Sequence, residues 1–149
     1  WVSSVGMSEH EYERVTYQLT LAVAKELARL NPGMVFEYVS GSGTDSTEKG
    51  GVRWARVKGR TENDLLKLPF RGAYMFRPAM IQPGPGIKSK TPLYQVVYSI
   101  TRPLLPVLKG LLPAHVTTSE KLGQAMIHVA RFGFSKPWIE NREINEMQV

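Results

Sequence analysis

The chain of 149 residues contains no cysteine, which excludes disulfides, thiol nucleophiles and thiolate metal sites. Histidine is scarce, and His10, His115 and His128 lie too far apart in the sequence to show the spacing of metal ligands. We therefore expect no metal site. The length fits a single domain, 1–149, and a hydrophobic content of 42% is typical of a globular protein rather than a disordered one.

Long apolar runs are also absent. The most apolar stretch, residues 93–116, is interrupted by two basic residues and three prolines, whereas a membrane-spanning helix needs about 20 mostly apolar residues. The residues after Trp1 show no basic segment followed by an apolar run, the pattern of a secretory leader. Together with the lack of cysteine, these absences predict a cytoplasmic protein.

Acidic residues are missing from residues 65–119, which carry seven of the 19 basic residues. The rest of the chain has 12 basic and 13 acidic residues, so this segment accounts for the net charge of +6. Such a segment suits a phosphate-bearing cofactor, a nucleic acid, an anionic membrane or simply a solvated face. We expect a cofactor, no nucleic-acid partner, and a membrane surface only as a minor alternative.

Helical periodicity is clearest over residues 8–30. Ser8 and Glu11 form a capping box at the start of this helix, and the run Asn-Pro-Gly at 31–33 stops it. Apolar residues spaced three or four apart form one stripe along it: Val15, Leu19, Val23, Leu27 and Leu30.

Strands and helices alternate after this helix. Residues 34–39 and 72–81 read as strands, with a polar loop and a helix over 52–67 between them. The second strand is expected to end at Arg77-Pro78. A strand–helix–strand unit places its strands in parallel, and parallel sheets are covered by helices on both faces. The predicted class is therefore α/β, a partial Rossmann-like fold with parallel strands and flanking helices.

The region after the second strand opens with glycine and proline. These residues make 82–90 a loop, and prolines break the helical pattern over 92–112. We expect residues 93–112 to form a lid over a substrate cleft, and the helices within 91–135 to form the substrate side of the domain.

A last helix and strand are expected near the end of the chain. Thr117 and Glu120 make a second capping box, for a helix that buries Leu122, Met126 and Val129 and closes near Gly133. One short strand is expected within 138–144.

Small polar residues and glycines follow the first strand at its carboxyl end, where open α/β sheets bind ligands. This run is Val-Ser-Gly-Ser-Gly-Thr at 39–44, and Trp-Ala-Arg-Val-Lys-Gly-Arg-Thr-Glu-Asn follows at 54–63. The second strand ends in Arg-Pro-Ala-Met-Ile at 77–81. Together these runs resemble the short-chain dehydrogenase/reductase superfamily, in its extended or atypical NAD-dependent epimerase-like branch, over roughly residues 8–135.

The resemblance implies a site that binds NAD or NADP and an unknown small-molecule substrate in the intact protein. Ser40 or Ser42 matches the family's serine, which holds the substrate oxygen. Lys58 matches the lysine that hydrogen-bonds the nicotinamide ribose, and Arg77 lines the cofactor cleft. The backbone of the next four residues would flank the nicotinamide: Pro78, Ala79, Met80 and Ile81.

Two departures from the family pattern change what the resemblance implies. Trp54 stands where the family has its general acid/base tyrosine, and an indole N–H has no proton to exchange near neutral pH. Ser42, Thr44 or Tyr74 would have to move the proton instead. The family's Gly-x-x-Gly-x-x-Gly phosphate loop has no counterpart. The resemblance therefore implies a C-terminal half, and we expect the isolated chain to bind no cofactor.

Three functions stay open at this point. The first is an NAD(P)-dependent epimerase-, dehydratase- or oxidoreductase-like protein, and the second is a non-catalytic nucleotide-binding or protein-interaction pseudoenzyme. The third is a membrane-surface or anion-binding module that uses residues 65–119. The family commonly dimerises through helices matching 8–30 and 52–67, so we expect a homo-oligomer through these helices or through the edge of strand 34–39.

Overall fold

A parallel sheet forms the centre of the computed structural model, which describes residues 6–82 and 115–147. Its strands lie in the order β1-β2-β5, with β1 at Val35–Val39, β2 at Gly72–Arg77 and β5 at Trp138–Glu140. A second parallel pair joins β3 (Met80–Gln82) to β4 (Val116–Thr118). The predicted α/β class with parallel strands is confirmed.

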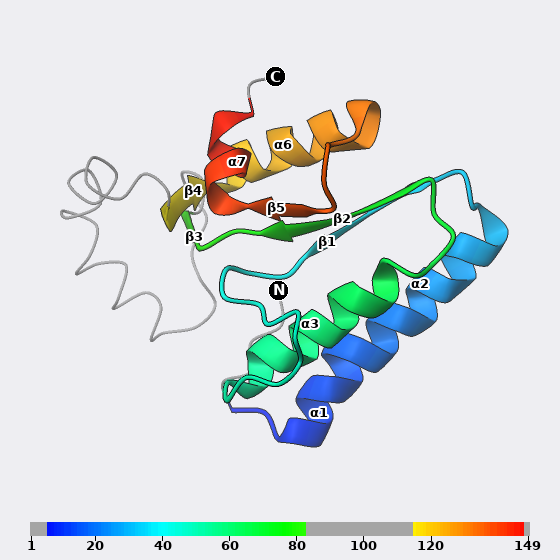
Figure 1. The fold of residues 1–149 in the computed structure, drawn as a ribbon, viewed down its shortest axis with the longest axis vertical. Coiled ribbons are helices and arrows are strands. Elements are labelled where there is room, and N and C mark those ends of the chain that lie inside the picture. The colour runs from blue at the N-terminus through cyan, green and yellow to red at the C-terminus, as the bar shows by residue number, and fades with distance from the viewer. Residues whose placement is uncertain (1–5, 83–114, 148–149) are drawn as a thin grey trace.

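Helices cover both faces of the central sheet (Figure 1). One face carries α1 (Glu9–Glu13), the π-helical segment η1 (Arg14–Gln18), α2 (Leu19–Leu30) and α3 (Arg53–Leu65). The other face carries α6 (Ser119–Phe132) and α7 (Asn141–Glu146). A hydrophobic core lies on each face of the sheet, and consecutive residues of β2 point into different cores. Met75 packs with Leu65 of α3, whereas Phe76 packs with Val129 of α6.

The first helix begins as predicted but buries a different face. The capping box of Ser8 and Glu11 is present. The apolar stripe is not the buried side, since Leu19, Val23 and Leu30 are 58%, 50% and 68% exposed. The buried positions are instead Tyr12, Thr16, Leu21, Ala24 and Ala28. The step of five between Thr16 and Leu21 spans the π-helical turn, which inserts one residue and moves the inward face by one position.

The second strand divides in two at Pro78. β2 ends at Arg77, as expected, and the residues from Met80 onward form β3 in the second sheet. Proline has no N–H to donate to a ladder, so the chain leaves the central sheet there.

The capping box predicted at Thr117 and Glu120 is wrong. Thr118 is the N-cap of α6, and its hydroxyl accepts a hydrogen bond from the Lys121 N–H at 3.1 Å. Thr117 lies in β4, where it pairs with Ile81 and is buried. The strand therefore takes the residue that the sequence pattern gave to the helix cap.

The short strand expected within 138–144 is present. It covers Trp138–Glu140, and α7 starts at once with a capping box of Glu140 and Glu143. The expected lid over 93–112 lies outside the described residues, as do residues 83–90 of the predicted loop and four bases of the basic segment: Lys88, Lys90, Arg102 and Lys109. In the described part of the chain, none of the helices has the length and apolar character that crossing a membrane would require.

Candidate functional site

The candidate site lies at the carboxyl ends of β1 and β2. The backbone N–H of Ser40 donates to the Phe76 carbonyl at 2.8 Å, and that of Ser42 donates to the Pro78 carbonyl at 2.9 Å. The glycine-rich turn after β1 therefore continues along the end of β2. Two runs that the sequence analysis singled out, 39–44 and 77–81, lie side by side as a result.

This turn packs closely on the first turns of α3. A Cβ atom at Gly41 would lie 3.7 Å from the Lys58 Nζ, and one at Gly43 would lie 3.7 Å from the edge of the Trp54 ring. Gly43 also has a φ of 80°, which disfavours a residue with a side chain. The turn, Trp54 and Lys58 thus form one compact unit.

Lys58 occupies the centre of this unit. Its side chain is only 7% exposed, and Nζ donates to the carbonyl oxygen of Ser40. Nζ also lies 5.9 Å from the centre of the Trp54 ring, a distance suited to a cation–π contact. Burial lowers the pKa of Lys58 to about 8, although the nearby Glu62 carboxylate opposes this shift. Lys58 is therefore a desolvated cation that titrates near physiological pH.

The two candidate serines have different surroundings. Ser40 is completely buried, and its hydroxyl donates to the Glu62 carboxylate and lies 3.2 Å from the Phe76 carbonyl. Ser42 is exposed. Of the two, Ser42 has the accessible position for a substrate contact.

The other hydroxyls considered as proton donors are less well placed. Thr44 is buried, and its hydroxyl donates to the Gly41 carbonyl at 2.7 Å. Tyr74 packs on the opposite face of the sheet, and its hydroxyl accepts from the Phe134 N–H at 3.3 Å. Ser42 is therefore the one exposed hydroxyl of the three.

Arg77 joins several elements around the site. Its Nε lies 3.1 Å from a carboxylate oxygen of Glu62, its Nη2 pairs with the other oxygen, and its Nη1 lies 3.3 Å from Glu140. Its Nη2 also bonds the hydroxyl of Ser46. This guanidinium therefore ties β2 to α3, β5 and the loop, and its contact with a cofactor remains a prediction.

The segment after Arg77 is held by α7. The Ala79 N–H donates to the side-chain oxygen of the buried Asn141 at 2.9 Å. Pro78 is buried, and Met80 and Ile81 pair with Val116 and Thr117 in the second sheet. These contacts fix the backbone that the resemblance places beside the nicotinamide.

Sequence reasoning missed two residues of this arrangement, Glu62 and Asn141. Glu62 follows Lys58 by four positions on a predicted helix, and this spacing would have placed both side chains on one face. Asn141 is 62 positions from its partner Ala79, and no local pattern announces such a contact.

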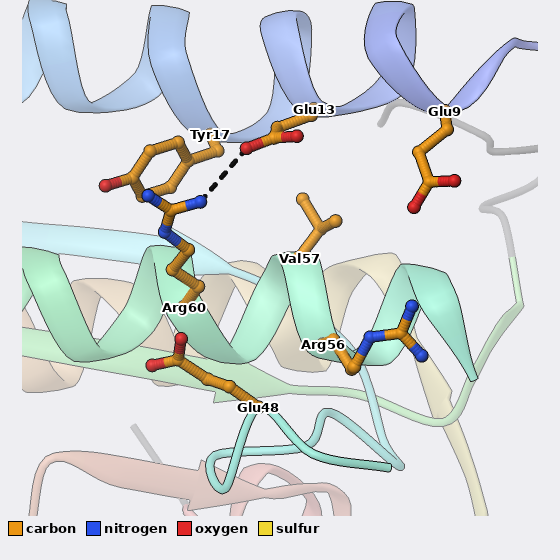
Figure 2. Close-up of a pocket in the computed structure, with 7 residues that line it drawn as sticks. All are labelled: Glu9, Glu13, Tyr17, Glu48, Arg56, Val57 and Arg60. Atoms are coloured by element: carbon orange, nitrogen blue, oxygen red, sulfur yellow. Dashed lines mark hydrogen bonds and ion pairs between the residues drawn. The ribbon is translucent and has the colours of Figure 1, made fainter. Parts of the chain in front are cut away.

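A hollow of about 240 Å³, separate from the candidate site, lies between α3 and the helix formed by α1 and η1 (Figure 2). It is lined by Glu9, Glu13, Tyr17, Glu48, Arg56, Val57 and Arg60. Arg60 pairs with Glu13 at 3.0 Å and stacks 4.2 Å from the centre of the Tyr17 ring, while Arg56 donates to the Gly50 carbonyl at 2.6 Å. Both arginines of this hollow already have partners, and the ion pair of Arg60 with Glu13 links α3 to the first helix.

The arrangement at the strand ends suits a ligand with hydroxyl or phosphate oxygens, since it combines a buried cation, an exposed hydroxyl and a close backbone turn. Over residues 6–82 and 115–147, no group of three or more acidic or histidine side chains is placed to hold a metal ion. A scan against models of protein families finds no match for the chain, and a search of curated proteins finds none either.

Proposed function

We propose that the chain supplies the substrate side and the ribose-contacting lysine of an NAD(P)-dependent epimerase- or oxidoreductase-like protein of the short-chain dehydrogenase/reductase type. One observation carries the proposal. Lys58, Trp54 and the turn containing Ser42 converge at the carboxyl ends of two adjacent parallel strands, the edge at which such sheets bind nucleotides.

The donor set fits the ribose and nicotinamide part of such a cofactor. Lys58 offers an ammonium group for the ribose hydroxyls, and Gly41 and Gly43 place no side chain between the backbone of the turn and a ligand. Ser42 would hold the substrate oxygen, and the segment that follows Arg77 would flank the nicotinamide. The cofactor would supply the hydride acceptor or donor when bound.

The lack of cysteine supports the proposal that this protein is located in the cytoplasm.

Cofactor titration tests this proposal directly. NADH and NADPH are added to the intact protein that the resemblance implies, since the isolated chain is expected to bind no cofactor. Binding is followed through the fluorescence of the reduced nicotinamide. Saturable binding that Lys58→Met weakens at least tenfold is the expected result. Lys121→Met removes an exposed lysine from α6 on the opposite face and serves as the matched control. Absence of binding by either nucleotide would refute both nucleotide functions.

A specific observation favours the second candidate, a nucleotide-binding pseudoenzyme. Trp54 holds the position next to Lys58 where the resemblance requires a proton donor, and indole cannot exchange a proton there. We expect Trp54→Tyr to create or raise NAD(P)H-dependent turnover on a panel of carbonyl compounds if the site is catalytic. Binding without turnover in both forms would support the pseudoenzyme.

Self-association is also proposed, through the outer face of the first helix. Leu19, Val23 and Leu30 are exposed there, and an apolar stripe of this kind favours burial against a second copy of the chain. β1 is the end strand of the described sheet and offers an alternative contact. Sedimentation should show a dimer that the double change Leu19→Glu and Val23→Glu converts to monomer. Ile127→Glu, an equally exposed position on α6, should leave the dimer intact.

The third candidate, an anion-binding membrane-surface module, rests on residues 65–119, of which the part 83–114 lies outside the described residues. Co-sedimentation with anionic vesicles tests it. Binding that falls as salt increases would support the module, and no such binding would remove it.

A further inference from the structure

Glu62 is a fully buried carboxylate on α3, one helical turn after Lys58. Burying a carboxylate is unfavourable unless its charge is balanced and its oxygens are hydrogen-bonded. Both of its oxygens have partners, since one accepts from the Ser40 hydroxyl and from Arg77 Nε, and the other pairs with Arg77 Nη2. This two-point contact fixes the orientation of the carboxylate.

Ser40 connects this carboxylate to Lys58. Its hydroxyl donates to Glu62, while its carbonyl oxygen accepts a hydrogen bond from the Lys58 Nζ. A single residue at the end of β1 thus carries both contacts. The buried serine acts between two charged groups, and the hydroxyl accessible to a substrate belongs to Ser42.

We infer that Glu62 is a positioning residue of the proposed cofactor site, which fixes Ser40 against the end of β2 and keeps Lys58 charged and aimed at the ribose. The functional part of this inference rests on the proposed cofactor binding. The hydrogen bonds from Ser40 to Glu62 and from Lys58 to Ser40 are seen in the structure itself, so they do not depend on that proposal.

The charges around Lys58 explain why Glu62 matters. Burial lowers the pKa of Lys58 to about 8, and Glu62 is the carboxylate that raises it. Arg77, on β2, adds a positive charge behind Glu62. On β1, burial raises the pKa of Tyr38, so this phenol stays neutral. In the loop, the Asp45 carboxylate bonds to Thr47 and to the Gly50 N–H.

Removing the charge of Glu62 should therefore favour the neutral amine of Lys58 at physiological pH. The sign follows from the group: loss of a nearby negative charge lowers the pKa of a lysine, so the cation persists only at lower pH. Nucleotide binding that depends on this cation should then be weak at pH 8 and recover toward pH 6.

The test follows the Lys58 Cε resonance by carbon-13 NMR through a pH titration. Glu62→Gln should shift the Lys58 midpoint clearly below about 8. Glu62→Asp should lower this midpoint by less than Glu62→Gln, because it keeps the negative charge but places it one methylene farther away. Asp64→Asn removes a partly exposed carboxylate from the same helix, where it pairs with Lys67, and should leave the Lys58 midpoint unchanged.

NADH affinity supplies the second measurement, on the same variants of the intact protein. A fall of one unit from a pKa of about 8 would reduce the cationic fraction of Lys58 at pH 8 from about one half to about one eleventh. Glu62→Gln should therefore weaken binding about fivefold at pH 8 and by much less at pH 6. If native protein binds no nucleotide, the proposed function fails while the NMR result still decides the role of Glu62. If Glu62→Gln folds, binds NADH normally and leaves the Lys58 titration unchanged, Glu62 is only structural and the inference is overturned. Should Glu62→Gln fail to fold, an unchanged Lys58 midpoint in Glu62→Asp overturns it equally.

Discussion

Gly59 makes the most demanding backbone contact of α3, and its replacement gives the sharpest test of this architecture. The helix carries Gly59 directly beneath the loop that follows the candidate site, where the Asp45 N–H donates to the Ala55 carbonyl at 3.1 Å. A Cβ atom at Gly59 would lie 2.5 Å from the carbonyl carbon of Asp45, closer still to its oxygen, and 3.1 Å from the Ser46 nitrogen. Real Cβ atoms essentially never approach other heavy atoms within 3.0 Å.

Two opposing effects set the size of the change in Gly59→Ala. Alanine is the better helix former by about 1 kcal/mol, which would stabilise α3. Overpacking a tight contact costs about 1–3 kcal/mol, and the upper end applies because the obstacle is backbone that cannot rotate away. The net loss in the free energy of unfolding should be about 2 kcal/mol, and the melting temperature should fall by about 4–8 °C.

Gly123 provides a matched control for this prediction. It is also a helical glycine, in α6, but a Cβ atom there would meet nothing within 4 Å among the described residues. Gly123→Ala should therefore show only the helix-propensity gain of about 1 kcal/mol. Urea unfolding measures the free energy of unfolding of both variants, which should fall in Gly59→Ala and rise in Gly123→Ala. If Gly59→Ala stabilises the protein as much as Gly123→Ala, the loop does not pack on α3 as described.

Three further changes test the charges and the helix start. Burial raises the pKa of Glu37 from 4.5 to about 7, so the ionised carboxylate destabilises the folded state increasingly as the pH rises from about 4.5 to about 7, and fully above that. Glu37→Gln should therefore be about 1 kcal/mol more stable than native protein at pH 8, after allowance for partial exposure, and equal to it at pH 4. Arg77→Ala leaves Glu62 buried and unpaired and should cost about 3–5 kcal/mol in urea unfolding, whereas Glu140→Gln removes an exposed partner and should cost under about 1 kcal/mol. Ser8→Ala removes the cap of α1 and should cost about 1 kcal/mol, with faster amide exchange confined to that helix.

The elements of the fold were predictable because their signals are local. The capping box at Ser8, the Asn-Pro-Gly stop at 31–33 and the proline at 78 each act within a few residues, and each marks a boundary that the structure keeps. The buried face of the first helix was not predictable in this way. A π-helical turn changes the period in the middle of the helix, and an apolar stripe read at a constant period then points to the wrong side.

The candidate site shows the same difference between residues that local sequence identifies and contacts that it does not. Ser40, Trp54 and Lys58 lie on two consecutive elements, and the family resemblance alone groups them into one site. Their partners come from distant segments: Arg77 reaches Glu140 across 63 positions, and Ala79 reaches Asn141 across 62. Sheet order decides which strand ends meet, and a single sequence carries no direct record of it. The sequence therefore indicates which residues have the chemistry, and the tertiary contacts decide which of them face a ligand.

The pairing of Trp54 with Lys58 separates two tasks that the resemblance assigns to one lysine. A lysine beside a tyrosine both binds the cofactor and makes the phenol easier to deprotonate, but an indole offers no such proton. Under the proposed function, only the binding task remains for Lys58, and the Trp54 ring 5.9 Å away adds a favourable surface for its charge. Burying Lys58 still disfavours its cation, and this cost is offset by Glu62, which Arg77 holds in place. Under the proposed function, the local electrostatics therefore preserve a cation for binding beside a residue that cannot donate a proton, and this favours nucleotide recognition over proton transfer as the task of Lys58.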